Sequence, residues 1–365
     1  MGVKLGEICK FQSGGTPAKG NAEYFNGKIP WITTIALNGG NIDESNAVDW
    51  ITEKAIMESA AKIVPAFSVM VGTRVGVGKV AINTVDMSTS QDIISLIGID
   101  ENIWNKEYLC KFLQGKNRYL NSKARGATIK GIKIDVLSSL ELPDISLEEQ
   151  KRISSIIDVM KNIISSYQYE LQKLDELIKS RFIEMFGDPI SNSKKLVTKD
   201  LKDVFVLKAG DFTAASDISD KPTETKIYPC YGGNGIRGYV DEYNQEGAYS
   251  LIGRQGALSG NVQYAYGKFK NTEHALLVTP KIEMNSIWLN QLLVNLDLKR
   301  YQTGAAQPGL SVKNLQDIQV ISVPIELQNQ FADFVAQVDK SKVAIQAALD
   351  KTQLLFDSLM QEYFG

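Results

Sequence analysis

The stretch "GATIKGIKIDVLSSLELPDISLEEQKRI" occupies residues 126–153, and "GAAQPGLSVKNLQDIQVISVPIELQNQF" occupies residues 304–331. They align without a gap at an offset of 304 − 126 = 178 residues, and the same offset places "EMFG" (184–187) over "EYFG" (362–365). Repetition at a fixed offset predicts a chain built from two similar halves. The identical pairs include Gly126/Gly304, Ala127/Ala305, Gly131/Gly309, Leu137/Leu315, Glu148/Glu326 and Gln150/Gln328.

Three earlier segments also recur in the same order, separated by insertions of different length. Each half therefore has a variable globular part followed by a better matched tail. We pair Arg74 with Arg254 and "IW" at 103–104 with "IW" at 287–288. The three segment pairs are "LGEICKFQSGG" (5–15) with "LKDVFVLKAGD" (201–211), "GTRVGVGKV" (72–80) with "GRQGALSGNV" (253–262), and "NIWNKEYL" (102–109) with "SIWLNQLL" (286–293).

The globular parts are predicted to be mixed. Short β-rich runs such as "SVMVGT", "DIISLIGI", "AYSLIG" and "HALLVT" alternate with glycine-rich turns. Helical segments are expected near 103–120 and 286–301.

Both tails are predicted to be long helices. Ser146 and Glu149 have the spacing of a capping box, whereas the second helix starts near Pro324, which suits a first turn. Apolar residues then recur in alternating steps of four and three, as in a heptad seam, although Lys342 and Thr352 interrupt the second one. The seam residues are Ile153, Ile157, Met160, Ile164, Tyr167, Leu171, Leu174 and Ile178, and then Phe331, Val335, Val338, Ile345, Leu349, Phe356 and Leu359.

A helix with one apolar stripe must bury it, and the obvious partner is the other tail. Each helix would measure ~60 Å for roughly 40 residues. Because a whole folded unit links the two helices, either relative orientation is topologically possible. A pseudo-twofold arrangement would make them antiparallel, with the globular parts at opposite ends. The predicted fold is therefore α+β, with two mixed α/β domains at 1–146 and 188–324, a central spacer helix at 147–187 and a C-terminal one at 325–365.

Composition limits the function classes. The 365 residues carry a net charge of −2, no apolar run long enough for a membrane span and no N-terminal apolar segment typical of a signal peptide. Cys9, Cys110 and Cys230 lie far apart, and His274 is the only histidine, which disfavours a zinc site or a disulfide framework. We expect a cytoplasmic protein without membrane contact.

Two segments resemble catalytic motifs but lack residues that those motifs require. "GTRVGVGKV" resembles a phosphate loop, but Thr73 and Val80 stand where that motif needs Gly and Ser or Thr. "PDISLEEQK" resembles a metal-dependent nuclease motif, yet Glu149 is explained by helix capping and the second copy has no carboxylate pair. No catalytic or metal-binding residue is predicted.

We call the segments "GATIKGI" (126–132) and "GAAQPGL" (304–310), which connect each globular part to its long helix, the first and second joins. Basic residues concentrate before and around the first join. Between Lys106 and Lys133 the chain has eight cations and one acid, Glu107, a local net charge of +7. Such a cluster suits phosphate neutralisation, although a solvated helix face is the alternative. The corresponding segment of the second half is poorer in cations, with Lys299, Arg300 and Lys313. The residues of the first half predicted to contact DNA are Arg74, Lys79, Lys116, Arg118, Lys123, Arg125, Lys130 and Lys133.

The second half instead concentrates tyrosine. Seven of the fourteen tyrosines lie between Tyr228 and Tyr266, interleaved with glycines. Tyr, Asn, Gln and Arg on such loops suit hydrogen bonding to DNA, while a β-core with tight turns is the alternative reading. The residues predicted to contact DNA here are Tyr231, Asn234, Arg237, Arg254, Gln255 and Lys313.

Several segments resemble the specificity subunits of type I restriction–modification systems. "FQSGGTP…EYFNGKIPWITT" (11–34) and "IYPCYGGNGIRGYVDEY…GAYSLIGRQGALSGNV…TEHALLV" (227–278) are similar to that family's target-recognition domains. The stretches 126–153 and 304–331 are similar to its glycine loop, strand and start of the spacer helix. That loop often carries a glutamine, as at Gln307, whereas Ile129 occupies the place in the first copy.

The resemblance implies a non-catalytic subunit that reads a split, asymmetric target in double-stranded DNA, one half-site per domain. It implies docking to two methyltransferase subunits and to restriction subunits. S-adenosylmethionine, ATP and Mg would then be used by those partners, with no cofactor in this chain. Two other classes of protein are alternatives: a protein-binding scaffold with a dimerising coiled coil, and a nuclease acting alone.

Overall fold

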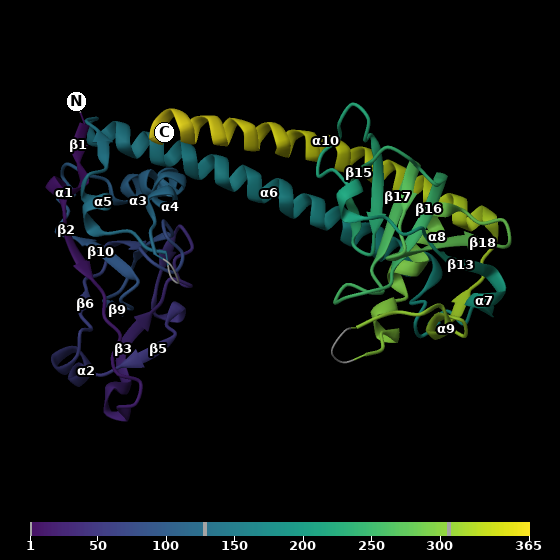
Figure 1. Ribbon diagram of the computed structural model, residues 1–365, viewed down its shortest axis with the longest axis horizontal. Coiled ribbons are helices and arrows are strands. Elements are labelled where there is room, and N and C mark those ends of the chain that lie inside the picture. Colours follow the sequence, from purple (N-terminus) through teal and green to yellow (C-terminus); the bar gives the residue numbers. More distant parts are fainter. Residues whose placement is uncertain (1, 127–129, 305–307) are drawn as a thin grey trace. The chain divides into compact units, whose positions relative to one another are not determined.

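The computed structural model describes residues 2–126, 130–304 and 308–365 and divides into two compact units (Figure 1). Unit 1 contains the chain up to Ser166 together with Ala348–Gly365, and unit 2 is Tyr167–Ala347. We call the globular parts of these units head 1 and head 2. Ile129 and Gln307 lie outside the described residues.

The main sheet of head 1 has the strand order β2-β10-β7-β8-β4. Its first three pairings are antiparallel and the last, between β8 and β4, is parallel. A second sheet has the order β5-β3-β9-β6. The strands are β2 (Lys10–Ser13), β3 (Phe25–Ile32), β4 (Asn41–Ile42), β5 (Asp49–Ile51), β6 (Ile63–Val64), β7 (Val69–Gly72), β8 (Val80–Asn83), β9 (Met87–Thr89) and β10 (Ile93–Ile97).

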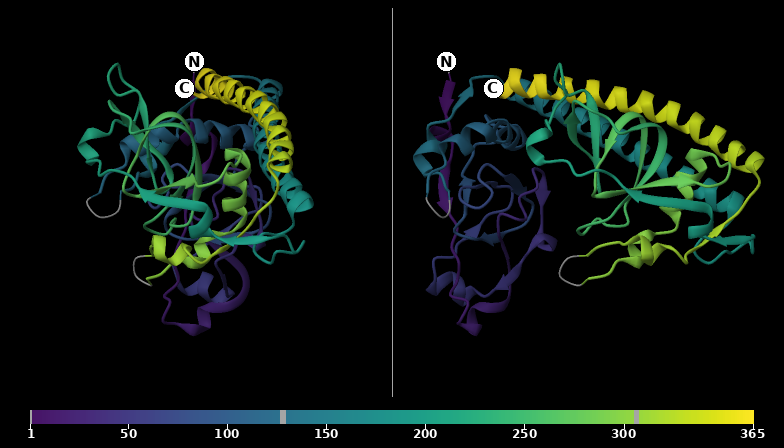
Figure 2. Two further views of the ribbon diagram at one scale, coloured as in Figure 1. Left: turned by 90° about the vertical axis from the view of Figure 1, so that its right-hand side faces the viewer. Right: turned by 45° about the vertical axis from the view of Figure 1, so that its right-hand side comes forward.

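Head 2 repeats this arrangement. Its sheet has the order β13-β18-β16-β17-β14-β15, and its first four pairings have the same senses as those of head 1, ending with the parallel pair of β17 and β14. Figure 2 shows this sheet from two further sides. The variable insertions form β3, β5, β6 and β9 in head 1 and β15 in head 2. The strands are β13 (Phe205–Ala209), β14 (Tyr228–Gly232), β15 (Gly235–Val240), β16 (Gln245–Gly253), β17 (Val262–Asn271) and β18 (Ala275–Pro280).

A two-stranded sheet and short helices complete each unit at the spacer end. Leu5 N donates to Leu140 O and Leu201 N donates to Ile318 O, both at 2.8 Å, which confirms the pairing of the first matched segments. These elements are β1 (Gly2–Lys4) with β11 (Glu141–Pro143), β12 (Thr198–Asp200) with β19 (Gln319–Ile321), α1 (Leu5–Ile8), α5 (Ile134–Ser138), α7 (Leu201–Val204) and α9 (Val312–Leu315).

The remaining helices pack on or beside the sheets. Buried Leu109 and Phe112 of α3 join the core that contains β7 and β10, and buried Leu289 and Leu292 of α8 do the same in head 2. These helices are α2 (Glu53–Glu58), α3 (Lys106–Gly115), α4 (Asn117–Lys123) and α8 (Ser286–Asn295), with 3₁₀ turns η1 (Ala22–Tyr24), η2 (Glu44–Asn46), η3 (Ala215–Asp217) and η4 (Leu298–Tyr301).

The two long helices are α6 (Leu147–Phe186) and α10 (Ile325–Phe364). Ser146 Oγ accepts the Glu149 N–H at 3.2 Å, as a capping residue does, but the Glu149 carboxylate binds Arg152. Only half of the expected capping box therefore forms. α10 follows Pro324, whose carbonyl accepts the N–H of Gln328 at 3.2 Å.

Within each unit the two helices run antiparallel. In unit 2 the end of α6 contacts the start of α10, where Phe182 and Phe331 lie 5.4 Å apart between ring centroids. In unit 1 the start of α6 shares a core with Phe364 at the end of α10, and Figure 1 shows these segments side by side. None of the predicted seam positions is exposed, and Lys342, which interrupts the stripe, pairs with Asp175 at 2.7 Å. The predicted antiparallel, internally repeated α+β fold is confirmed.

A duplicated glutamine joins each head to its spacer helix. Buried Gln150 accepts the Asn105 N–H at 2.8 Å and donates to Ile103 O and Ile145 O. Gln328 does the equivalent in unit 2, accepting the Asn285 N–H at 2.9 Å and donating to Val323 O. Because Asn105 and Asn285 are the N-caps of α3 and α8, these are the matching positions of the two helices. The prediction that matched Trp104 with Trp288 is therefore wrong by four residues.

Tyr108 is the true counterpart of Trp288. Its ring lies 5.5 Å from that of Phe364, and the ring of Trp288 lies 6.0 Å from that of Phe186. Phe364 and Phe186 are themselves 364 − 186 = 178 residues apart, in the repeated "EYFG" and "EMFG". The C-terminal end of α10 thus completes the core of unit 1, and the C-terminal end of α6 completes the core of unit 2.

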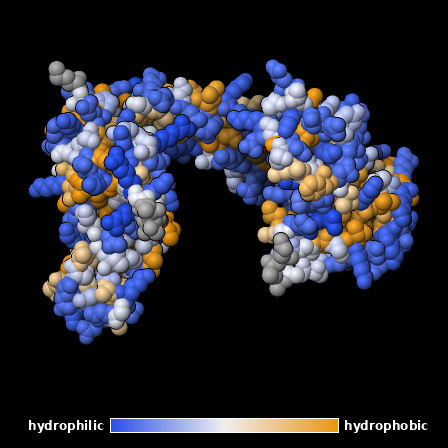
Figure 3. Space-filling view, viewed as in Figure 1, coloured by the Kyte–Doolittle hydropathy of each residue, from blue (hydrophilic) through white to orange (hydrophobic). Residues whose placement is uncertain are grey.

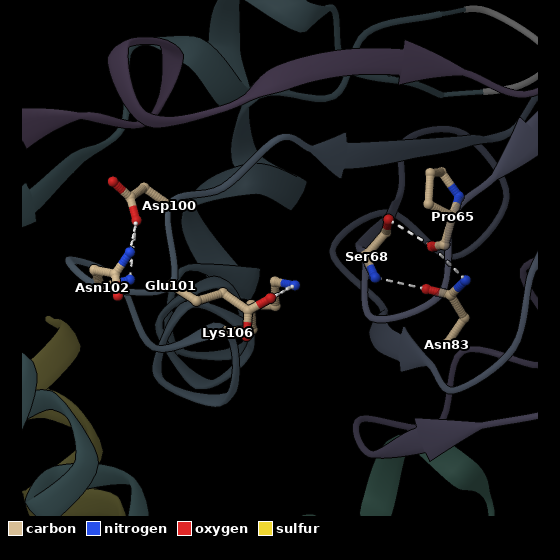
Figure 4. A network of polar contacts seen from close by, with 7 residues as sticks. All are labelled: Pro65, Ser68, Asn83, Asp100, Glu101, Asn102 and Lys106. Carbon is tan, nitrogen blue, oxygen red and sulfur yellow. Dashed lines mark hydrogen bonds and ion pairs between the residues drawn. The ribbon is translucent and has the colours of Figure 1, made fainter.

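Polar groups within head 1 are held by similar local networks (Figure 4). Asn83, which is fully buried, accepts the Ser68 N–H and donates to Pro65 O and Val85 O, each at 2.8 Å. This network fixes the turn between β6 and β7, since an amide with all these bonds has little freedom. Hydrophilic residues cover much of the visible face of each unit (Figure 3).

Candidate nucleic-acid interface

A glycine-rich loop packs against the join in each head. In head 1 the Gly72 N–H donates to Lys79 O and the Gly78 N–H donates to Gly72 O, at 2.8 and 2.9 Å. In head 2 the Gly253 N–H donates to Asn261 O and the Gly260 N–H donates to Gly253 O, at 2.9 and 2.8 Å. Gly78 and Gly260 both have positive φ, which a residue with a side chain rarely adopts.

The join is bonded to this loop in the same way twice. The Ile132 N–H donates to Thr73 O at 2.8 Å, and the Leu310 N–H donates to Arg254 O at 2.7 Å. Arg254 therefore occupies the place of Thr73, and the prediction that it matches Arg74 is wrong by one residue. The counterpart of Arg74 is Gln255, and the exposed side chains of both follow the bonded carbonyl.

A basic groove of about 640 Å³ lies beside the join in head 1. Four of the predicted cations line it, drawn from the glycine loop, the end of α4 and both sides of the join. Arg125 and Gly131 exchange backbone hydrogen bonds at 2.9 and 3.0 Å, which holds these two lining residues together. Among the described lining residues Asp135 is the single acid, so these residues give the groove a net charge of about +3 at neutral pH. Its lining residues are Arg74, Lys123, Arg125, Gly131, Ile132, Lys133, Asp135 and Val136.

Three other lysines of the basic cluster form ion pairs or hydrogen bonds with other residues of unit 1. Lys106 pairs with Glu101 (Figure 4), and buried Lys111 pairs with Asp158 at 2.8 Å. The Lys116 ammonium donates to Gly365 O at 3.0 Å and lies 5.5 Å from the Phe112 ring, and burial lowers its pKa. The predicted DNA-contact residue Lys116 thus packs against the end of α10, whereas Lys79, Arg118 and Lys130 are exposed outside the groove lining.

The four cations that line the head 1 groove have no cationic counterparts in head 2, where the cations of the matching segment are Lys299, Arg300 and Lys313. At an offset of 178, Tyr301, Thr303 and Ser311 replace Lys123, Arg125 and Lys133. The backbone bond between Thr303 and Gly309 repeats that between Arg125 and Gly131, which supports this register. Lys313 is exposed at the position of Asp135. The join of head 2 therefore offers mostly neutral hydrogen-bonding groups.

The other residues of head 2 that were predicted to contact DNA have different environments. Tyr231 packs edge-on against Phe269 at 5.4 Å, and burial raises the pKa of its hydroxyl. Asn234 accepts from Asn261 Nδ2 at 3.1 Å, while Arg237 is exposed on β15. Tyr231 has the packing expected of a core residue.

Arg254, Gln255 and His274 form a polar cluster beside the head 2 join. Arg254 is partly buried, and its guanidinium donates to Glu273 O at 3.2 Å. Gln255 Oε1 lies 2.9 Å from His274 Nδ1, and His274 Nε2 lies 3.1 Å from Glu273 Oε1. Sequence reasoning missed His274 and Glu273, because only the pairing of β16 with β18 brings them to the loop.

The tyrosine-rich segment mostly stabilises the sheet. Tyr228 and Tyr243 lie 5.0 Å apart between ring centroids, and Tyr249 packs against Phe269. Tyr264 shares a hydrogen bond with Ser286 at 2.9 Å, whereas Tyr266 is 78% exposed. Packing thus accounts for most of these rings.

The described side chains offer little for catalysis. Burial raises the pKa of the Cys9 thiol to about 12 and that of the Cys110 thiol to about 11, so neither is a thiolate near neutral pH. Across residues 2–126, 130–304 and 308–365, no three His, Cys, Asp or Glu side chains are grouped as metal ligands would be. The described helices include none that is long and apolar enough to cross a membrane.

Known proteins share both the sequence and the fold. A family model described as the type I restriction modification DNA specificity domain matches residues 1–176 and 193–353. The specificity subunit of the type I restriction enzyme EcoprrI of Escherichia coli is 27% identical over 351 residues, covering 92% of this chain and 87% of that protein. A putative type I specificity subunit of Mycoplasma genitalium is 22% identical, covering 95% and 87%.

The solved S subunit of a type I restriction–modification system from M. genitalium has a TM-score of 0.60 at 18% identity, covering all of this chain and 96% of that one. The repeated match covers most of the sequence and falls on both heads. This chain therefore belongs to the type I restriction–modification DNA specificity family, whose members recognise DNA while other subunits carry the catalytic activities.

Proposed function

We propose that this chain reads a split, asymmetric target in double-stranded DNA, one half-site per head. The observation that carries the proposal is the basic groove of head 1, where Arg74, Lys123, Arg125 and Lys133 line one concave surface. Clustered Lys and Arg neutralise backbone phosphates, which supplies most of the affinity of such proteins for DNA. The equivalent loops of head 2 differ in charge, as two readers of different sequences would.

We also propose that α6 and α10 hold the heads at a fixed spacing and dock two methyltransferase subunits, with restriction subunits joining the assembly. Large apolar side chains point to solvent on both helices, including Tyr169 on α6 and Val343 and Leu354 on α10, which are 71% and 72% exposed. In the proposed assembly the methyltransferase subunits cover these side chains. S-adenosylmethionine, ATP and Mg would serve those partners, which act on DNA in the cytoplasm.

Salt dependence of DNA binding tests the groove. The triple variant Lys123→Ala, Arg125→Ala, Lys133→Ala removes three cations from the lining. If each contacts one phosphate, the slope of log affinity against log salt should fall in magnitude by about 2 to 3, since each contact contributes ~0.9. Binding of the full chain to a duplex, titrated at several salt concentrations with methyltransferase subunit added, measures it.

A matched control removes the same charge elsewhere in unit 1. Lys4, Lys10 and Lys151 are exposed outside the groove, and replacing all three with alanine should leave the slope nearly unchanged. Equal slopes for the groove variant and the unmodified chain would place the groove off the DNA. The protein-scaffold alternative predicts no DNA binding by any of these proteins.

A further inference from the structure

The cluster at the join of head 2 contains an amide that is held in place yet faces outward. Gln255 is exposed, but its Oε1 lies 2.9 Å from Nδ1 of His274. The backbone of Gln255 is bridged to Gly309, which ties it to the join. An exposed glutamine ordinarily samples many rotamers, and a side chain held this way loses less entropy when it binds.

We propose that Gln255, positioned by His274, recognises an adenine in the half-site read by head 2. The inference rests on the proposed function, because it assumes that this surface faces DNA. Its location supports that assumption: Gln255 is the counterpart of Arg74, which lines the basic groove of head 1.

The chemistry of the neighbours favours a base edge over a phosphate. Lys123, Arg125 and Lys133 of head 1 are replaced in head 2 by Tyr301, Thr303 and Ser311. Arg74 likewise has a neutral counterpart, Gln255, and neutral donors and acceptors match base edges in the major groove. A glutamine amide is complementary to adenine, accepting from N6 and donating to N7.

His274 holds the Gln255 amide and leaves both a donor and an acceptor of that amide free. The Glu273 carboxylate lies 3.1 Å from His274 Nε2, while Nδ1 faces Gln255 Oε1. Because an amide oxygen can only accept, the hydrogen bond between them is donated by an Nδ1–H group. Gln255 then keeps both N–H groups and one lone pair of Oε1, which include the donor and the acceptor that adenine requires. His274 is thus a positioning residue.

Selection from a random-sequence duplex library tests the proposal. The full chain with methyltransferase subunit is compared with Gln255→Ala and with Arg74→Ala, the same change at the matching place in head 1. Gln255→Ala should lose preference at one adenine of one half-site, by about 5- to 150-fold, and leave the other half-site intact. Arg74→Ala should leave that adenine preference unchanged.

Two further measurements isolate the contact. Replacing the selected adenine by 7-deazaadenine removes N7, so it should weaken binding of the unmodified chain but not of Gln255→Ala. His274→Ala should reduce the preference at the same adenine less than Gln255→Ala does. The double variant should be no worse there than Gln255→Ala alone, because coupled residues are not additive.

The outcomes separate the two proposals. An unmodified chain that enriches no motif contradicts the proposed function itself. An enriched motif that Gln255→Ala leaves unchanged, or changes at a base other than adenine, overturns the inference alone. Relaxation of both half-sites together would also overturn it, since that result points to a general loss of binding.

Discussion

At the residue scale, the fold depends on a few side chains that the repeat uses twice. Gln150 and Gln328 were visible in the sequence as an identical pair, but nothing in it showed that they bond to the N-caps of α3 and α8. The alignment of Trp104 with Trp288 was wrong for the same reason. It rested on the shared letters "IW", whereas the packing shows that Tyr108 is the counterpart of Trp288.

Gln150→Leu should destabilise unit 1. The variant leaves a buried N–H of Asn105 and the carbonyls of Ile103 and Ile145 without their partner, at about 1–3 kcal/mol for a buried unsatisfied group. We expect the free energy of unfolding to fall by about 2–4 kcal/mol, measured by urea denaturation.

The matched control is Gln168→Leu, on an exposed position of the same helix. It should change stability by no more than about 0.5 kcal/mol. Equal effects of the two substitutions would show that the hydrogen bonds of Gln150 contribute nothing specific.

At the element scale, the helices were the most predictable part of the chain. Heptad spacing from Ile153 to Ile178 and from Phe331 to Leu359 predicted residues of α6 and α10 that are buried or half-buried in the structure. The basic cluster was predictable in composition but not in use. Lys111 is neutralised by Asp158, which is 47 residues away in sequence, and only the packing of α3 on α6 brings the two together.

The groove, too, could be predicted from the sequence only in part. Its cations at Lys123, Arg125 and Lys133 are close in sequence, but Arg74 joins them only because the Thr73 carbonyl accepts the Ile132 N–H. Long-range backbone bonds of this kind leave no periodic signal in a sequence. They also explain why the Arg74–Arg254 pairing failed by one residue.

Lengthening both helices by one heptad tests their proposed role as a spacer. Seven residues inserted after Ser166 and seven after Ala347 keep the seam in register, because the seam repeats every seven residues. They add ~10 Å, or about three base pairs. Selected targets should show an unchanged pair of half-sequences separated by a gap about three base pairs longer.

Inserting the same seven residues in α6 alone is the control, because it misaligns the two stripes and should lower stability without defining a new gap. An unchanged gap in the doubly extended protein, with both half-sequences retained, would mean that the helices do not set the spacing.

At the scale of the whole molecule, the two units share one plan and differ where they would meet a ligand. The order of the first five strands, the pair Gln150 and Gln328 and the joins are duplicated, whereas the insertions and the charges beside the joins are not. Duplication without duplicated charge suits one architecture that reads two different half-sequences.

The central claim is that the chain reads a split target, and selection of bound DNA tests it most directly. Random-sequence duplexes are incubated with the full chain and methyltransferase subunit, and the bound fraction is sequenced. The account predicts enrichment of two unlike half-sequences separated by a gap of fixed length and unspecified sequence. Enrichment of a single uninterrupted motif, or of none, would contradict it.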